Sequence, residues 1–179
     1  MEFLSGYKVS TDMSLDMFNL IKGYNPTTIV ELGNGPGALH IAMRYAIHAQ
    51  AKIYSYELDS SRTSFLQKQL NVRGMSADQS ILTVGDVFKT FIANPFIFDL
   101  LIIDIDNTWE RIYEVAIKNE FIFNQIKNGA NVIIEGGAKA HPRINENTLN
   151  KFNASFKTPV FAYKHITGVR TSFSKLELL

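Results

Sequence analysis

Cysteine is absent from the 179 residues of this sequence. A disulfide framework, a thiolate metal site and a cysteine nucleophile are therefore all excluded. The chain also lacks an excess of either charge, because 18 lysines and arginines stand against 17 aspartates and glutamates. Proteins that bind duplex nucleic acid usually need a broad basic field to engage the phosphates. Nucleic acid is therefore not a favoured partner.

Long apolar runs are missing as well. No segment approaches the roughly 20 consecutive apolar residues that span a membrane, and the first residues, MEFLSGYKVSTDM, show no apolar core of a signal peptide. We expect a cytoplasmic protein without a membrane partner. With 46% hydrophobic and 20% charged residues, the composition is typical of a globular protein. The length predicts a single domain over residues 1–179.

What the sequence does contain is an alternation of short apolar segments with amphipathic ones. The apolar segments predict strands at residues 27–32, 51–58, 80–86, 98–106, 130–137, 159–166 and 172–179. Helical spacing predicts helices at residues 14–24, 38–49, 60–70 and 109–126. Apolar strands that alternate with helices indicate an α/β fold, with a mainly parallel sheet covered on both faces. The last two strands are too close for a helical crossover, so we expect them to be antiparallel.

Glycines and carboxylates follow the first four predicted strands. In chain order these residues are Glu31, Gly33, Asn34, Gly35, Gly37, Glu57, Gly85, Asp86 and Asp104. Glycine lets the backbone turn tightly and approach a ligand closely. In an open parallel sheet, ligands bind beyond the carboxyl ends of the strands, and a carboxylate such as Glu57 can accept hydrogen bonds from a ribose diol. A tight turn or a solvated strand end explains each feature alone, but the series at four consecutive strands indicates a binding site.

This series resembles the class I methyltransferases, which use S-adenosylmethionine (SAM). The resemblance rests on E-x-G-x-G-x-G after the first strand, an acidic residue after the second, Gly-Asp after the third and Asp after the fourth. It implies a Rossmann-like fold with a mostly parallel seven-stranded sheet, a C-terminal antiparallel hairpin and helices on both faces. Within the class, the chain is most similar to the catechol and caffeoyl-CoA type O-methyltransferases. That likeness implies that residues 1–26 are a helical segment forming part of the pocket.

The resemblance also implies a role for each residue of the series. Those around the methionine part of SAM would be Gly33, Asn34, Gly35 and Gly37. Glu31 would orient this loop or the amino group, and Glu57 would hold the ribose hydroxyls. Asp86 and the backbone of Val87 would face the adenine amino group. Asp104 would lie beside the amino-acid end of the cofactor or bind a metal.

The pattern of the metal-dependent relatives is incomplete in this chain. Those enzymes hold a divalent cation with an Asp after the fourth strand and an Asp-Asn pair after the fifth, where this chain has Glu135-Gly-Gly. A reduced site of Asp104 and Glu135 is an alternative that we do not favour. The lysine that follows the second Asp of those enzymes is Asn107 here, and Asn cannot act as a general base.

Two residues near the expected site have competing interpretations. His141, after the fifth strand, could take a proton from the methyl acceptor, or it could be an ordinary exposed loop histidine. Trp109, the only tryptophan, could line the acceptor pocket or pack at the start of a helix. The catalytic candidates are therefore Asp104 and His141. No role is assigned to His40, His48 and His165.

The function expected from this pattern is methyl transfer from SAM to an oxygen or nitrogen of a small molecule. Displacement at a sulfonium mainly requires positioning, so a strong base can be absent. The chain has no added lid domain, and a homodimer could close the pocket. The alternative is a catalytically inactive SAM-binding or partner subunit with the same fold. A nicotinamide-dependent dehydrogenase is less favoured, because its third glycine would come one residue later than Gly37.

Overall fold

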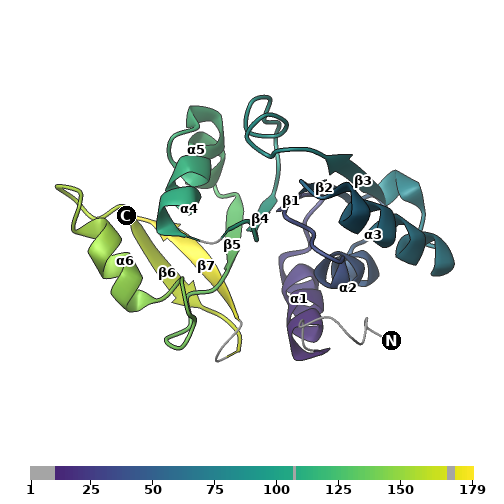
Figure 1. The fold of residues 1–179 in the computed structure, drawn as a ribbon, viewed down its shortest axis with the longest axis horizontal. Coiled ribbons are helices and arrows are strands. Elements are labelled where there is room, and N and C mark those ends of the chain that lie inside the picture. The colour runs from purple at the N-terminus through teal and green to yellow at the C-terminus, as the bar shows by residue number, and fades with distance from the viewer. Residues whose placement is uncertain (1–10, 107, 169–171) are drawn as a thin grey trace. The chain divides into compact units, whose positions relative to one another are not determined.

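The computed structural model describes residues 11–106, 108–168 and 172–179. The chain divides into two compact units, which contain residues 1–99 and residues 100–179. Each unit has strands and helices of its own, coloured from purple to teal in the first and from teal to yellow in the second (Figure 1).

The first unit holds three parallel strands in the order β3-β2-β1. These strands are β1 (Thr28–Leu32), β2 (Lys52–Glu57) and β3 (Ser80–Val84). The helices are α1 (Thr11–Tyr24), α2 (Ala38–Ala46) and α3 (Ser60–Val72), with a short 3₁₀ turn, η1 (Ala77–Gln79), before β3. Glu31 pairs with Ser55, and Glu57 pairs with Val84. The carboxyl ends of the three strands therefore lie at one edge.

Different segments cover the two faces of this three-stranded part. Helices α2 and α3 pack against one face through the buried residues Ile41, Leu66 and Leu70, with the partly buried Met75 and Leu82 packed against them. Because side chains alternate along a strand, Tyr54 and Tyr56 of β2 lie on the other face. There Tyr54 contacts Phe96 with 4.7 Å between ring centroids, and Tyr56 contacts Phe91 at 5.6 Å. The segment between β3 and β4 thus buries this face with aromatic rings.

The second unit holds four strands in the order β4-β5-β7-β6. These strands are β4 (Leu100–Ile103), β5 (Asn131–Glu135), β6 (Phe161–His165) and β7 (Phe173–Leu178). The helices are α4 (Trp109–Ala116), α5 (Glu120–Lys127) and α6 (Glu146–Asn153). Strands β4 and β5 are parallel, and β7 is antiparallel to both of its neighbours. The antiparallel pairing expected for the last two strands is therefore confirmed.

The region between residues 109 and 153 differs from the sequence-based expectation. The single helix predicted over residues 109–126 is wrong, since α4 ends at Ala116 and α5 begins at Glu120. Asn119 causes the new start, because its side chain caps α5 by accepting a hydrogen bond from the Ile122 amide at 3.1 Å. Helix α6 was not expected. Asn145 and Thr148 form a reciprocal capping box at its start, which is a local signal in an otherwise polar segment.

The remaining predicted elements are confirmed within a few residues at each end. The helix predicted over residues 14–24 is α1, which begins at Thr11. Residues 1–10 of the N-terminal segment and Asn107 lie outside the described residues. The pocket role of residues 1–26 and the single-domain assignment of residues 1–179 stay predictions. Within the described part of the chain, no helix has the length and apolar character needed to cross a membrane.

Candidate functional site

The glycine loop, defined as residues 33–37, joins β1 to α2 in the first unit. Its three glycines have positive φ angles, 85° at Gly33, 50° at Gly35 and 90° at Gly37. Residues other than glycine rarely adopt such backbone angles. A Cβ atom at position 37 would lie 2.5 Å from the Cδ1 of Leu66 in α3. Gly37 is therefore required both for the turn and for the close packing of α2 on α3.

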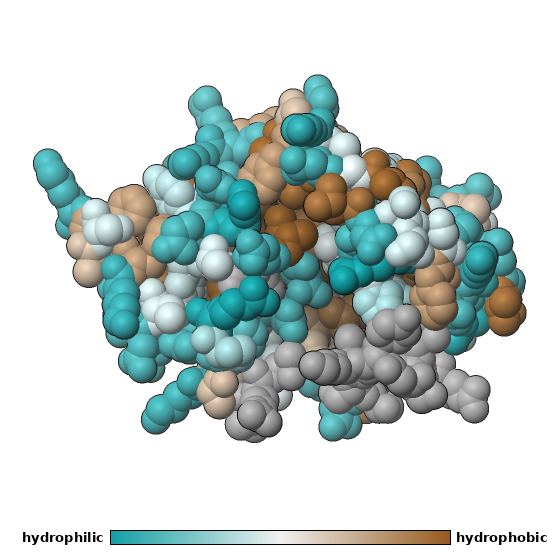
Figure 2. All heavy atoms as spheres, in the orientation of Figure 1, coloured by the Kyte–Doolittle hydropathy of each residue, from teal (hydrophilic) through white to brown (hydrophobic). Residues whose placement is uncertain are grey.

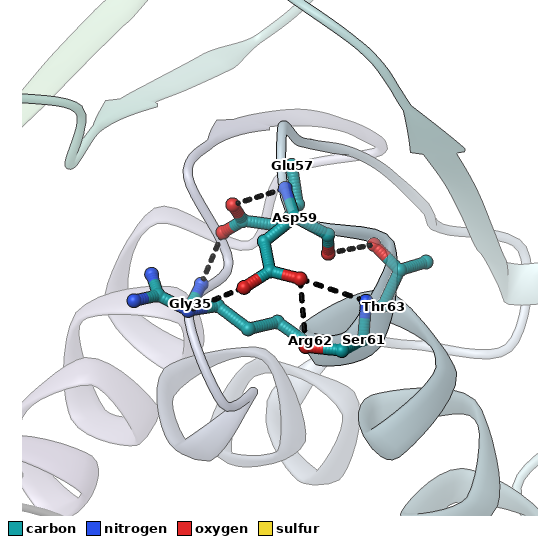
Figure 3. Close-up of polar contacts among 6 residues, drawn as sticks. All are labelled: Gly35, Glu57, Asp59, Ser61, Arg62 and Thr63. Carbon is teal, nitrogen blue, oxygen red and sulfur yellow. Dashed lines mark hydrogen bonds and ion pairs between the residues drawn. The ribbon is translucent and has the colours of Figure 1, made fainter.

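Glu57 fastens the glycine loop to the end of β2 (Figure 3). Its Oε2 accepts a hydrogen bond from the Gly35 amide at 2.9 Å, and its Oε1 accepts one from the Asp59 amide at 3.0 Å. The side chain is 7% exposed. A carboxylate has about four lone-pair sites, so each oxygen can accept one further hydrogen bond. The residue predicted to hold a ribose therefore also orders the loop beside it.

Asp59 begins α3 next to this contact. Its carboxylate accepts hydrogen bonds from the amide and the hydroxyl of Ser61, and those bonds lower the pKa of Asp59 below its usual value. Arg62 forms an exposed ion pair with it at 3.6 Å. Asp59 is thus a helix cap, as the sequence around the start of α3 indicates.

The loop offers an acceptor and open space for a ligand. Asn34 is buried, and its Nδ2 donates to the Ser55 hydroxyl at 3.0 Å. Its Oδ1 has no hydrogen-bond partner among the described residues, which is unfavourable for a buried polar atom. A Cβ atom added to Gly35 would meet nothing within 4 Å. The loop therefore has free space beside its backbone at Gly35 and an amide oxygen without a donor at Asn34.

Glu31 lies within β1 and points into the core. Its Oε2 lies 2.7 Å from Nδ1 of His40, and the Nε2 of His40 lies 3.0 Å from the Ser80 hydroxyl. The exposed fractions of the Glu31 and His40 side chains are 2% and 0%. Sequence reasoning assigned no role to His40. The signal that could have found it is its place in the first turn of α2, directly after the loop.

Asp86 and Val87 follow β3 at the same edge. The Gly85 amide donates to the carbonyl of Glu57 at 2.9 Å, which joins this turn to the end of β2. Asp86 is half-buried, and its Oδ1 accepts a hydrogen bond from the Phe88 amide at 2.9 Å. Val87 is buried. The structure thus places the predicted residues of the first three strands together along one edge of the first unit.

Leu58 is a candidate that sequence reasoning missed. It directly follows Glu57 and is 73% exposed. Figure 2 shows apolar surface in the region of the first unit where β2 and β3 end. An exposed apolar side chain beside the carboxylate that is predicted to hold a ribose offers a face for a flat aromatic group. The sequence signal was an apolar residue placed after a strand-end carboxylate.

The other candidates lie in the second unit. Asp104 is half-buried and directly follows β4. His141 is 6% exposed, and its Nδ1 accepts hydrogen bonds from the Ile144 amide at 2.9 Å and the Arg143 amide at 3.3 Å. Burial lowers the pKa of His141, with a weaker upward effect of Glu135. The ring is therefore buried and accepts two backbone hydrogen bonds at Nδ1, and it is not an exposed loop histidine. Its role as a base stays a prediction.

Trp109 packs inside the second unit. Its ring stacks on Tyr163 with 5.8 Å between centroids, and its Nε1 donates to the Thr148 hydroxyl at 3.0 Å. Phe161 lies beside it at 6.1 Å. The indole thus joins α4 to α6 and β6. Its ring also borders a surface groove of about 520 Å³ with Arg143 and Lys151, so a role in acceptor binding stays a prediction.

Metal ligands do not gather in the described residues. Within residues 11–106, 108–168 and 172–179, no group of three or more His, Asp or Glu side chains could hold a metal ion. The less favoured pair of Asp104 and Glu135 would therefore need ligands from water or substrate.

Solved structures with a similar fold match nearly the full length of this chain. No protein-family model matches the sequence, and no curated protein is significantly similar to it. An SAH-bound methyltransferase from Podospora anserina is 16% identical, with a TM-score of 0.71 over 96% of this chain and 80% of that one. (SAH is S-adenosylhomocysteine.) An O-methyltransferase of tomaymycin synthesis from Streptomyces achromogenes, in complex with SAM, is 17% identical, with a TM-score of 0.66 over 98% and 83%.

A third structure, from Staphylococcus aureus, is described as a caffeoyl-CoA O-methyltransferase. It is 13% identical, with a TM-score of 0.66 over 96% of this chain and 85% of that one. The chain has the class I methyltransferase fold. The parallel pairs and the antiparallel pairing of β6 with β7 match the mostly parallel sheet with a C-terminal antiparallel hairpin that the sequence predicts. The glycine loop and Glu57 lie at the carboxyl ends of β1 and β2, which is the edge where open α/β folds in general bind ligands.

Proposed function

We propose that this chain is a SAM-dependent methyltransferase that modifies an oxygen or nitrogen of a small molecule. The observation that carries the proposal is the hydrogen bond between Gly35 and Glu57, which unites a positive-φ glycine loop with a strand-end carboxylate. Both groups lie at the edge where open α/β folds bind ligands. The fold is shared with methyltransferases crystallised with SAM or SAH.

The residues of the first unit fit this cofactor. The free lone pairs of Glu57 suit the two ribose hydroxyls, and the open side of Gly35 leaves room for the methionine chain. Asn34 Oδ1 lacks a donor, and an ammonium group could supply one. The exposed side chain of Leu58 and the turn at Asp86 suit the adenine ring and its amino group.

The chemistry then depends mainly on positioning. SAM, when bound, supplies a methyl group on a positively charged sulfur, and transfer joins that carbon to the acceptor atom while the electron pair of the broken C–S bond stays on sulfur. The chain's own task is to hold the acceptor in line with this bond and to exclude water. Asp104 and His141 are the candidates for orienting the acceptor or removing its proton. A homodimer is the proposed means of closing the acceptor site.

The second candidate function is a catalytically inactive cofactor-binding or partner subunit. The observation that favours it is the use of His141 Nδ1 by two backbone amides. A neutral imidazole that accepts at Nδ1 carries its proton on Nε2, so it has no lone pair left to take a proton from the methyl acceptor. Turnover distinguishes the enzyme from an inactive cofactor-binding subunit, since both of these should bind the cofactor.

Calorimetric binding of SAM and SAH, with and without magnesium, tests the proposal. We expect micromolar affinity, and we expect Glu57→Ala to weaken it by at least about tenfold, or 1.4 kcal/mol. Glu177→Ala, an exposed glutamate of β7, is the matched control and should bind like the wild type. Failure of the wild-type protein to bind either ligand would remove the methyltransferase proposal.

Methyl transfer from labelled SAM to panels of hydroxyl and amine acceptors tests turnover. Labelled product above background would support the enzyme. Cofactor binding without any product across both panels would favour the inactive subunit. A magnesium requirement for turnover would restore the pair of Asp104 and Glu135 as metal ligands.

A further inference from the structure

A chain of three buried polar groups lies at the two ends of the glycine loop, and two of its members have no role in the chemistry above. It consists of Glu31 in β1, His40 in the first turn of α2 and Ser80 at the start of β3. The ring of His40 bridges the other two, with 2.7 Å from Nδ1 to the carboxylate and 3.0 Å from Nε2 to the hydroxyl. Both ring nitrogens are therefore satisfied by groups from different strands.

The order serine–histidine–carboxylate is also that of a hydrolytic triad. Two observations exclude that role here. The His40 side chain has no exposed surface, and Ser80 is buried. A nucleophile must reach its substrate, so this chain of hydrogen bonds cannot attack one. What remains is the mechanical effect of the two bonds on the elements that they join.

Those two hydrogen bonds connect the residues on either side of the glycine loop. Residue 31 precedes the loop and residue 40 follows it, so the bond between Glu31 and His40 joins the two ends of the loop. The Ser80 hydroxyl then connects the imidazole of His40 to β3, two strands away from β1. Asn34 and Gly35 add their own bonds to Ser55 and Glu57 of β2. Hydrogen bonds therefore hold both the residues that flank the loop and the residues in its middle.

We propose that His40 is a positioning residue, which holds the glycine loop in its ligand-binding conformation through Glu31 and Ser80. This inference rests on the proposed function for its meaning in cofactor binding. Without the imidazole of His40, the buried Glu31 carboxylate would lose its described partner, which is strongly unfavourable for a charge in the core. Glu31 would then leave its place, and the two ends of the loop would be free to separate.

Hydrogen exchange of the loop tests this without any ligand. The amides of Gly33, Gly35 and Gly37 are bonded at 2.8 Å, 2.9 Å and 2.8 Å, so their exchange reports the closed loop. We expect His40→Leu to speed this exchange by about tenfold or more, because the loop opens locally. His40→Asn keeps an N–H donor near the position of Nδ1 and should restore exchange to within about threefold of the wild type.

Binding of SAH to the same variants is the second readout. If only closed loops bind, the affinity falls by the factor by which the closed population falls. Exchange reports the open fraction of the loop and affinity reports the closed fraction, so His40→Leu should lose SAH affinity only to the extent that the open loop becomes the major form. His40→Asn should recover any affinity that is lost. His48→Leu and His48→Asn, at the half-buried histidine just after α2, are the matched controls and should leave both quantities unchanged.

The outcomes separate this inference from the proposed function. A wild-type protein that does not bind SAH removes the proposed function, while the exchange experiment still tests His40. Unchanged loop exchange in a folded His40→Leu protein would overturn the inference, as would a His40→Asn protein that rescues neither quantity. If His40→Leu does not fold, Ser80→Ala removes only the outer bond, and exchange in the loop must still rise for the inference to stand.

Discussion

His141 is buried after β5, and its surroundings make stability depend on pH. Burial lowers its pKa below 6.5, the Glu135 charge opposes this, and Arg143 adds to the lowering. The unfolded chain therefore binds this proton at a higher pH than the folded chain. The contribution of His141 to the free energy of unfolding should be fully present above pH 6.5 and be lost as the pH decreases below it, until the folded pKa is passed. Urea unfolding at a series of pH values measures this.

His141→Asn is the matched variant for that prediction. An Asn oxygen can take the place of Nδ1 and accept from the amides of Arg143 and Ile144, but it does not titrate. We expect this variant to stay folded and to lose less stability on acidification than the wild type. An equal loss in both proteins would mean that another group causes the acid sensitivity.

Alanine variants of two glycines in the loop should affect different properties, one mainly the stability of the protein and the other mainly its affinity for SAH. Both have positive φ angles, so alanine costs about 1–2 kcal/mol of backbone strain at either position. At Gly37 the new Cβ would also meet Leu66 at 2.5 Å, and overpacking adds about 1–3 kcal/mol. At Gly35 it enters the open space proposed for the cofactor. Gly37→Ala should therefore lose more stability in urea, and Gly35→Ala should lose SAH affinity by about tenfold or more.

At the scale of elements, the separation of α4 from α5 depends on one cap. The Asn119 side chain accepts a hydrogen bond from the Ile122 amide at the start of α5. We expect Asn119→Ala to lower the free energy of unfolding by about 0.5–2 kcal/mol. Asn128→Ala, at an exposed position after the last turn of α5, is the control and should have little effect. Equal stability of the two variants would show that the cap does not stabilise α5.

At the scale of the whole molecule, a ligand bound to the first unit should also stabilise the second unit against unfolding if the two unfold together. The residues expected to hold the cofactor, apart from Asp104, lie between residues 31 and 87 in the first unit, whereas Trp109 is buried in the second. SAH at 100 times its Kd should raise the free energy of unfolding by about 2.7 kcal/mol. If residues 1–179 unfold as one domain, tryptophan fluorescence will report the full increase. A fluorescence transition that does not move would contradict the single-domain prediction.

The sequence by itself determined the class of fold and which residues follow the carboxyl ends of the strands. Burial on both faces produces apolar segments such as residues 100–103, and strand-end glycines and carboxylates follow them directly, so both signals are local. Only the tertiary structure decided which groups those residues contact. Glu57 meets the Gly35 amide across 22 positions of the sequence, and His40 meets the Ser80 hydroxyl across 40. Such bonds depend on strand register and helix packing, which bring distant residues together without leaving a pattern along the chain.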